Sequence, residues 1–368
     1  MKQALVLNIG SSTLKWAVLS AADGATVAEG SDNWRDADAA GRARQIRAAL
    51  SAAPPFEAAG HRVVHGGSKF REAAILDATT RASLDEFAEL DPLHMHPALA
   101  GIDAVTAMFP ALPQTASFDT SFHTTMSEAA AGYALPFEWT EKWNLRRFGF
   151  HGLSVAWSVG RVAERMGRMP ARLVVAHLGS GASVTAVANG RSADTTMGFS
   201  PLEGLMMGRR SGSVDPGLLM HLQTRHGITA TEMLETLNER SGLFGVSGVS
   251  GDLREVLAAA DSGNARARLA VERFTLGVRR AIGAMSGVLG GADAIVFTGG
   301  IGENSDRIRR EVAGAVTGVR LDEPTNAAPR DDADIAAADS SARVFVIRAR
   351  EERVILDDLR RLLSAGAR

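Results

Sequence analysis

The sequence predicts a two-domain α/β protein with an internal duplication. Its 368 residues exceed what one hydrophobic core usually holds, so we expect two domains of roughly 150 to 200 residues. Two strand–turn–strand segments, one near the N-terminus and one near mid-chain, have the same layout. Helical spacing of apolar residues is clearest at 264–289 and at 351–363.

The expected elements follow in order along the chain. The β-rich runs 4–9 and 14–19 flank a Gly/Ser turn, which predicts a hairpin, and 60–67 and 114–123 each indicate a strand that ends in a loop. A second hairpin is expected to join 172–178 to 183–188 through a small-residue turn at 179–182. The strand 294–297 then enters a glycine-rich turn at 298–305 and a helix, a layout that makes phosphate binding possible without matching the P-loop or dinucleotide patterns. The alanine-rich region 331–341 is expected to be a surface loop.

Composition narrows the function. A net charge of −2 gives no basic field for nucleic acid, so no nucleic-acid partner is expected. No segment approaches the roughly 20 apolar residues of a membrane helix, and the N-terminal apolar run is too short for a secretion signal, so we expect a cytoplasmic protein without a membrane partner. Cysteine is absent, which excludes disulfides, thiolate catalysis and zinc–thiolate sites.

The run 194–212 has the most distinctive chemistry of the chain. It combines hydroxyls, glycines and the pair Arg209 and Arg210. The guanidinium fork complements phosphate and carboxylate oxygens, and glycines let the backbone approach a ligand closely. We interpret the run as a loop around an anion; a surface turn with solvated arginines is the alternative for the run taken alone.

Ten segments in order resemble the acetate and propionate kinase family, within the larger actin, sugar kinase and Hsp70 ATPase superfamily. They are 8–15, 60–67, 92–94, 118–123, 148–152, 177–181, 194–212, 245–250, 297–304 and 350–352. The resemblance implies a duplicated ribonuclease H-like fold with an interdomain cleft. Its domains would be 1–148, joined by the C-terminal helix 351–368, and 149–350. It also implies a homodimer that reversibly transfers the ATP γ-phosphate in line to acetate, giving acetyl phosphate and ADP.

The resemblance also assigns catalytic and metal-binding residues. Arg62 and Arg210 match two catalytic arginines, for the substrate carboxylate and the migrating phosphoryl group, and His151 matches a histidine that hydrogen-bonds that group. Mg²⁺, or Mn²⁺ in its place, would lie near Asp119 and Glu351 with Asn8 close by. A carboxylate acceptor is already ionised at neutral pH, so no general base is needed.

Two larger sets of binding residues follow from the same resemblance. The nucleotide would contact Lys15, His177, Gly179, Ser180, Gly181, Asp252, Leu253, Arg254, Gly300, Ile301 and Asn304, with Ser11 and Ser12 beside the phosphates and His94 near the same cleft. The acyl group would contact Arg62, Val64, Leu93, Phe150 and Pro201.

Structural alternatives accompany several of these residues. His94 and His177 could be core histidines, Asp119 a strand-end cap and Lys15 a solvated strand residue. The neighbour Glu352 leaves the choice of metal carboxylate open, and Arg209 leaves open which guanidinium reaches the phosphate. Four departures from the family pattern, at Met95, Val155, Ser180 and Arg209, and a chain shortened before Gly60 put affinity, acyl preference and dimer packing in question.

Other functions compete with acetate kinase activity. Propionate or butyrate could be the acceptor, because one methylene changes discrimination by only about 1 to 3 kcal/mol. A non-catalytic, nucleotide-switched binding module is a second alternative, although it needs no arginines that clamp a carboxylate. Pyrophosphate as the phosphoryl donor is a third, and it would require an occluded adenosine pocket.

Overall fold

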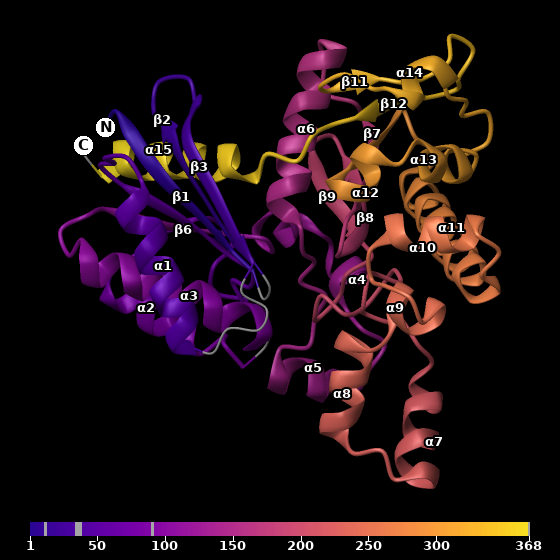
Figure 1. Cartoon of the computed structure of the whole chain (residues 1–368), viewed down its shortest axis with the longest axis horizontal. Coiled ribbons are helices and arrows are strands. Elements are labelled where there is room, and N and C mark those ends of the chain that lie inside the picture. The colour runs from indigo at the N-terminus through magenta and orange to yellow at the C-terminus, as the bar shows by residue number, and fades with distance from the viewer. Residues whose placement is uncertain (11–12, 34–38, 90–91, 367–368) are drawn as a thin grey trace. The chain divides into compact units, whose positions relative to one another are not determined.

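The protein folds as two compact units, seen in a computed structural model that describes residues 1–366 except 11–12, 34–38 and 90–91. Unit 1 comprises Met1–Thr124 and Arg350–Arg368, and unit 2 comprises Thr125–Ala349 (Figure 1). Ser11 and Ser12 lie outside the described residues, as do the side chains of Leu93 and His94.

Unit 1 is built on a six-stranded sheet in the order β3-β2-β1-β4-β6-β5. Strands β1, β4 and β6 are parallel, whereas β2, β3 and β5 run antiparallel to their neighbours. The strands are β1 (Gln3–Ile9), β2 (Thr13–Ser20), β3 (Thr26–Asn33), β4 (Ala59–Val63), β5 (Ala74–Ile75) and β6 (Gln114–Phe118). The helices are α1 (Ala39–Ala52), α2 (Ala78–Asp85), α3 (Pro92–Met108) and α15 (Glu351–Gly366), with a 3₁₀ turn at Ser121–Thr125.

Unit 2 repeats this topology. Its sheet order, β11-β12-β10-β7-β8-β9, is the same sequence of strands read from the other edge, with β7, β10 and β12 parallel. The strands are β7 (Arg172–Leu178), β8 (Ala182–Ala188), β9 (Arg191–Thr195), β10 (Ala294–Thr298), β11 (Ala333–Asp334) and β12 (Arg343–Val346). The helices are α4 (Glu128–Ala131), α5 (Phe137–Trp143), α6 (Gly152–Met166), α7 (Pro216–His226), α8 (Ala230–Glu239), α9 (Gly242–Ser247), α10 (Leu253–Asp261), α11 (Ala265–Leu289), α12 (Gly299–Asn304), α13 (Asp306–Ala313) and α14 (Glu323–Ala327).

Each sheet is covered by helices whose apolar side chains fill the core. In unit 1, α15 packs on β1, β4 and β6 through Ile355, Leu356 and Leu359, each at most 1% exposed, and its ribbon runs along these strands in Figure 1. In unit 2, α6 packs on β7 and β10, and the long helix α11 packs on β7, β8 and β9. Strand β10 is buried along its whole length, as expected of a central parallel strand covered on both faces.

The predicted hairpins and the two long helices are present. The first strand of the second hairpin has the predicted bounds, and the second strand begins one residue earlier than predicted, at Ala182. Helix α11 begins directly after Asn264, whose side chain accepts a hydrogen bond from the Ala267 N–H. The prediction of a surface loop at 331–341 was wrong in part. It contains the edge strand β11, and Ile335 is fully buried in it.

The unit boundary differs from the predicted domain boundary at 148/149, because residues 125–148 pack with unit 2. The Thr125 hydroxyl donates to the Ser192 carbonyl oxygen at 2.9 Å, and α4 packs against β9. Further along, the Phe148 N–H donates to the Gly198 carbonyl oxygen at 3.0 Å. Loop-to-strand contacts of this kind leave no signal in the local sequence pattern.

Candidate active site

Four predicted residues form one hydrogen-bonded set in unit 1. Asn8 lies on β1, Arg62 on β4, Asp119 directly after β6, and Glu351 at the first position of α15. Because β1, β4 and β6 are parallel neighbours, their carboxyl ends meet at one edge of the sheet, where ligands usually bind in open α/β sheets.

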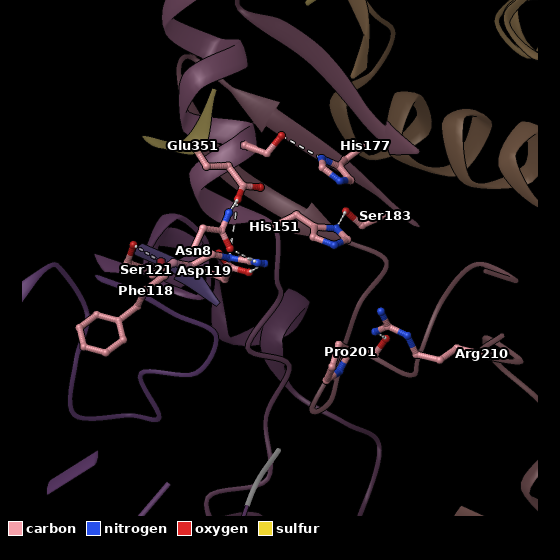
Figure 2. Close-up of polar contacts among 12 residues, drawn as sticks. Asn8, Phe118, Asp119, Ser121, His151, His177, Ser183, Pro201, Arg210 and Glu351 are labelled. Atoms are coloured by element: carbon pink, nitrogen blue, oxygen red, sulfur yellow. Dashed lines mark hydrogen bonds and ion pairs between the residues drawn. The ribbon is translucent and has the colours of Figure 1, made fainter. Parts of the chain in front are cut away.

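The Arg62 guanidinium is at the centre of this set, whose members Asn8, Asp119 and Glu351 are labelled in Figure 2. Its Nε and Nη2 donate to the two oxygens of Asp119, at 2.9 and 2.5 Å, and its Nη1 donates to Asn8 Oδ1 at 3.0 Å. The amide nitrogen of Asn8 donates to Glu351 Oε2 at 2.9 Å, and that oxygen is 3.7 Å from Arg62 Nε. Asp119 is 1% exposed and Arg62 17%, so the pair is well shielded from water.

This geometry distinguishes Glu351 from its neighbour Glu352. The contacts to Asn8 and Arg62 belong to Glu351. Burial, followed by the negative charge of Glu351, raises the pKa of the Glu352 carboxyl above its usual range.

The donor chemistry of unit 1 fits a magnesium ion. Among the residues the structure describes, no group of three or more His, Asp or Glu side chains is arranged to hold a metal. Mg²⁺ does not require such a cage in phosphoryl transfer, where one or two carboxylates act together with phosphate oxygens and water. Asp119, Glu351 and the Asn8 amide supply hard oxygen atoms of this kind, and the Arg62 charge offsets one carboxylate.

In unit 2, His151, His177 and Arg210 gather around the turn of the second hairpin. The two imidazole rings stack with centroids 4.1 Å apart. The Ser183 hydroxyl lies 3.0 Å from His151 Nδ1, and the Ser154 hydroxyl 2.8 Å from His177 Nδ1, so each ring is held on its Nδ1 side. Figure 2 shows the Ser183 contact.

Gly181 is the point on which Arg210 and His151 converge. A methyl group in place of its hydrogen would lie 3.0 Å from Arg210 Nη2 and 3.1 Å from His151 Nε2. His151 itself has a φ of 59°, a left-handed conformation that a non-glycine residue rarely adopts, and it directly precedes α6. Such backbone conformations are concentrated at functional sites.

The structure also separates the two adjacent arginines. Arg209 stacks on the Phe244 ring with its Cζ 4.4 Å from the centroid, and its Nη1 donates to the Glu239 carbonyl oxygen. Arg210 instead donates from Nη1 to the Pro201 carbonyl oxygen at 2.8 Å. Of the pair, Arg210 is therefore the residue directed toward His151 and Gly181.

The glycine turns predicted to hold nucleotide lie together in unit 2. A Cβ on Gly179 would be 3.7 Å from the Gly300 nitrogen, and the Gly208 N–H donates to the Ser180 carbonyl oxygen at 3.1 Å. A Cβ on Gly208 would in turn be 2.8 Å from the Gly251 carbonyl oxygen, next to Asp252. A Cβ on Gly300 would meet no described atom within 4 Å beyond its own helix, so this backbone faces open space.

The remaining nucleotide residues differ in how accessible they are. Leu253 is buried, and Asp252 caps α10 while pairing with Arg254, whose side chain is 89% exposed. Asn304 is exposed and donates to the Gly300 carbonyl oxygen, and Ile301 is half-buried. In unit 1, Lys15 is exposed and lies opposite Asn8 in the β1–β2 register, which places both side chains on the same face of the sheet.

The residues predicted to contact the acyl group are divided between the units. Val64 follows β4 in unit 1, where it is buried. Phe150 and Pro201 belong to unit 2, and both are buried. Each unit thus also holds one of the two predicted catalytic arginines, Arg62 in unit 1 and Arg210 in unit 2.

Sequence reasoning missed the two serines that hold the histidines. The duplication supplies a signal that could have found Ser183: it pairs with His177 in the β7–β8 register as Lys15 pairs with Asn8 in β1–β2. Ser154 lies on the first turn of α6, three residues after His151, and needs the folded helix to be recognised.

Known proteins share this sequence and architecture. A sequence model of the acetokinase family matches residues 45–357. The acetate kinase of Gloeobacter violaceus is 48% identical over 302 residues, covering 81% of this chain and 74% of that protein. The acetate kinase of Methanosarcina barkeri is 42% identical over 317 residues, covering 85% and 78%.

Solved structures agree along nearly the whole chain. The acetate kinase of Porphyromonas gingivalis superimposes with a TM-score of 0.88 at 33% identity, covering 99% of this chain and 100% of that one. A propionate kinase from Francisella tularensis subsp. tularensis gives a TM-score of 0.89 at 33% identity, covering 97% and 99%.

The duplicated fold and these similarities define a phosphotransferase. The two polar sets, rich in arginine, histidine and carboxylate, have the chemistry that this reaction uses. The chain belongs to the acetokinase family. The predicted family, fold class and enzyme class are thereby confirmed.

Proposed function

We propose that the protein is an acetate kinase, which transfers the γ-phosphate of ATP reversibly to acetate in a single in-line step. Membership of the acetokinase family supports the reaction. The observation that carries the residue roles is that each unit holds one predicted catalytic arginine within an ordered polar set: Arg62 with Asp119, and Arg210 with His151 around Gly181.

Arg62 is oriented for its role by Asp119 and by Asn8, whose amide links it to Glu351. A guanidinium only donates and a carboxylate only accepts, so the Asn8 amide must present its oxygen to Arg62 and its nitrogen to Glu351. This fixes the plane of the guanidinium at the carboxyl edge of the sheet. In the proposal, Arg62 neutralises the acetate carboxylate and the migrating phosphoryl group, which needs charge stabilisation more than covalent chemistry.

Arg210 and His151 act on the phosphoryl group from unit 2 in this proposal. Ser183 occupies the Nδ1 side of His151, so the Nε2 side faces Gly181 and is the side that would meet phosphate oxygens. The glycine turns at 179–181 and 299–300 would let the nucleotide phosphates and adenosine approach the backbone closely, because glycine carries no side chain.

Mg²⁺ would be held by Asp119 and Glu351 with Asn8 nearby, and Mn²⁺ could replace it. When bound, the ion would supply positive charge that offsets the charge of the phosphate oxygens. The charge of Arg62 offsets one of the two carboxylates, so the metal would add to an ordered, shielded set of oxygens that keeps a net negative charge.

The test is a hydroxamate assay with acetate and with ATP or pyrophosphate as donor. Acetyl phosphate should form with ATP and Mg²⁺. Its rate of formation should fall by at least about 100-fold in Arg62→Ala, because an interaction made in the transition state is removed. Arg81→Ala is the matched control, since Arg81 also pairs with carboxylates in unit 1 but outside the proposed site. Full turnover by Arg62→Ala would remove Arg62 from the mechanism, and no acyl phosphate with any donor would favour the nucleotide-switched module.

Propionate is the second candidate acceptor, favoured by the similarity to a propionate kinase. Initial rates with acetate, propionate and butyrate decide between them, and a higher kcat/KM for propionate would replace acetate in the proposal. A homodimer and a cytoplasmic location remain part of the proposal, and light scattering of the purified protein tests the first. Among the described helices, none combines the length and apolarity needed to cross a membrane.

A further inference from the structure

A second polar cluster in unit 2 lies next to the proposed site and has no role in the reaction outlined above. Glu203 receives two hydrogen bonds, one on each carboxylate oxygen. Arg147 Nη2 donates to Oε1 at 2.9 Å, and the Tyr133 hydroxyl donates to Oε2 at 2.5 Å. The Arg147 Cζ also lies 5.5 Å from the centroid of the Tyr133 ring.

Two of these three side chains also bind the backbone of the turn 196–203. Tyr133 accepts a hydrogen bond from the Phe199 N–H at 2.8 Å, while Arg147 Nη1 donates to the Thr196 carbonyl oxygen at 3.3 Å. Glu203 is itself part of this turn. Its Oε2 lies so close to Gly198 that a Cβ there would be 1.6 Å from it and 2.2 Å from the Tyr133 oxygen, so the turn folds directly onto the cluster.

Arg210 contacts this same turn. Arg210 Nη1 donates to the carbonyl oxygen of Pro201, two residues before Glu203. The segment that leads to His151 is attached to the same turn, because Phe148 and Gly149 donate their N–H groups to the Gly198 carbonyl oxygen. A cluster that fixes 196–203 therefore also fixes the distance between the Arg210 and His151 segments.

We propose that Tyr133, Glu203 and Arg147 form a clamp that positions the Arg210 guanidinium through the Pro201 carbonyl. The three are positioning residues and do not touch the reacting atoms. The inference rests on the proposed function for the role of Arg210, whereas the clamp itself is defined by contacts within unit 2.

The chemistry of the clamp makes Glu203 its least replaceable member. A carboxylate accepts from both donors at once, and bonds of this type are stronger because one partner is charged. Glutamine presents an NH₂ group to one of the two donors and cannot satisfy both. Tyr133 is the only tyrosine of the chain, so its ionisation can be followed without interference from another phenol.

The kinetic test compares Glu203→Gln and Tyr133→Phe with wild type, with Glu235→Gln as control because Glu235 is an exposed glutamate of unit 2 outside the clamp. We expect kcat to fall about 10- to 100-fold in both clamp variants, since small displacements of a catalytic group cost that much. The KM for ATP should change by less than about twofold, because the clamp does not contact the glycine turns. A purely stabilising role would lower the melting temperature while leaving kcat per folded molecule unchanged, and that outcome overturns the proposal.

A second measurement is independent of the reaction. Burial and the hydrogen bond to Glu203 raise the pKa of the Tyr133 phenol above its usual value of about 10, against smaller opposing contributions from the Phe199 N–H and the Arg147 charge. The phenolate absorbance should therefore appear at lower pH in Glu203→Gln than in wild type. The charged groups that face the phenol are Glu203 and Arg147. Identical titration curves would show that the Tyr133–Glu203 bond does not exist.

Crystal structures of wild type and Tyr133→Phe complete the test, and cover the case in which Glu203→Gln does not fold. We expect the 2.8 Å contact between Arg210 Nη1 and the Pro201 oxygen to be lost in Tyr133→Phe. An unchanged contact contradicts the clamp even if the enzyme uses another substrate. An intact clamp together with no acyl phosphate formation would instead count against the proposed function.

Discussion

Gly181 is the residue at which substitution most directly tests the geometry of unit 2. Arg210 Nη2 and His151 Nε2 both lie beside it, each about as close as a methyl group could tolerate. Both groups are the ends of side chains that are held elsewhere, Arg210 by Pro201 and His151 by Ser183. Neither can move aside without losing a hydrogen bond.

Gly181→Ala should therefore lower kcat by about 10-fold or more while changing the free energy of unfolding by less than about 1 kcal/mol. Steady-state rates with urea denaturation of the same preparation check both parts. Gly160→Ala is the control, because a Cβ at Gly160 meets no described atom within 4 Å beyond its own helix. Wild-type turnover by Gly181→Ala would show that Arg210 and His151 do not act at this position.

At the scale of elements, two of the glycines in and directly after helix α6, Gly160 and Gly167, have opposite requirements. Gly160 is an exposed interior position with open space around it, whereas Gly167 ends the helix with a φ of 68°. Alanine loses less backbone entropy than glycine in a helix but is strained in the left-handed region.

Gly160→Ala should raise the free energy of unfolding by about 0.5 to 1 kcal/mol, and Gly167→Ala should lower it by about 1 kcal/mol. Urea denaturation of the two variants beside wild type gives both values. Both variants replace glycine with alanine, so the sign of the change in unfolding free energy depends on the position alone. A change of the same sign in both variants would contradict the helix bounds assigned to α6.

The elements differ in how far the sequence determines them. Hairpin β7–β8 was predicted to within one residue because its β-rich strands flank a small-residue turn. Helix α11 was also predicted to within one residue, because its apolar period is long. The strand β11 was missed because two residues carry no period, and its burial depends on pairing with β12.

The polar set of unit 1 shows the same limit for the site. Asn8 and Glu351 are 343 positions apart, and no local pattern joins them. The resemblance to a family brought Asn8, Arg62, Asp119 and Glu351 onto one list, while their mutual hydrogen bonds required the fold. Tyr133 lies in no motif, and although Glu203 lies in the run 194–212, only the folded turn 196–203 reveals that the two are hydrogen-bonded.

At the scale of the whole molecule, stability should depend on pH through His61. This histidine on β4 is buried, and its Nε2 bonds to Gln114 Oε1 at 2.9 Å. Burial lowers the pKa of His61 to about 4, although the Gln114 bond partly opposes the shift. The unfolded chain, with a histidine pKa of about 6.5, binds the proton more readily, so the stability associated with neutral His61 is lost as pH falls below that value.

Between about pH 8 and about pH 5 this single group should remove about 2 kcal/mol of unfolding free energy. Urea denaturation at both pH values, for wild type and His61→Gln, isolates the contribution, because carboxylates titrate alike in both proteins. His226→Gln, at an exposed histidine, should behave as wild type does. An unchanged pH dependence in His61→Gln would contradict the burial of a neutral ring.

The route of the chain through α15 bears on how the protein is made. Unit 2 is formed by one continuous segment of the chain. In unit 1, the apolar face of the sheet is covered by Ile355, Leu356 and Leu359 of the C-terminal helix. On a ribosome, the segment synthesised first therefore cannot close its core until the final helix has emerged. Unit 1 is therefore synthesised first but completed last, and during elongation it is the unit most in need of protection by chaperones.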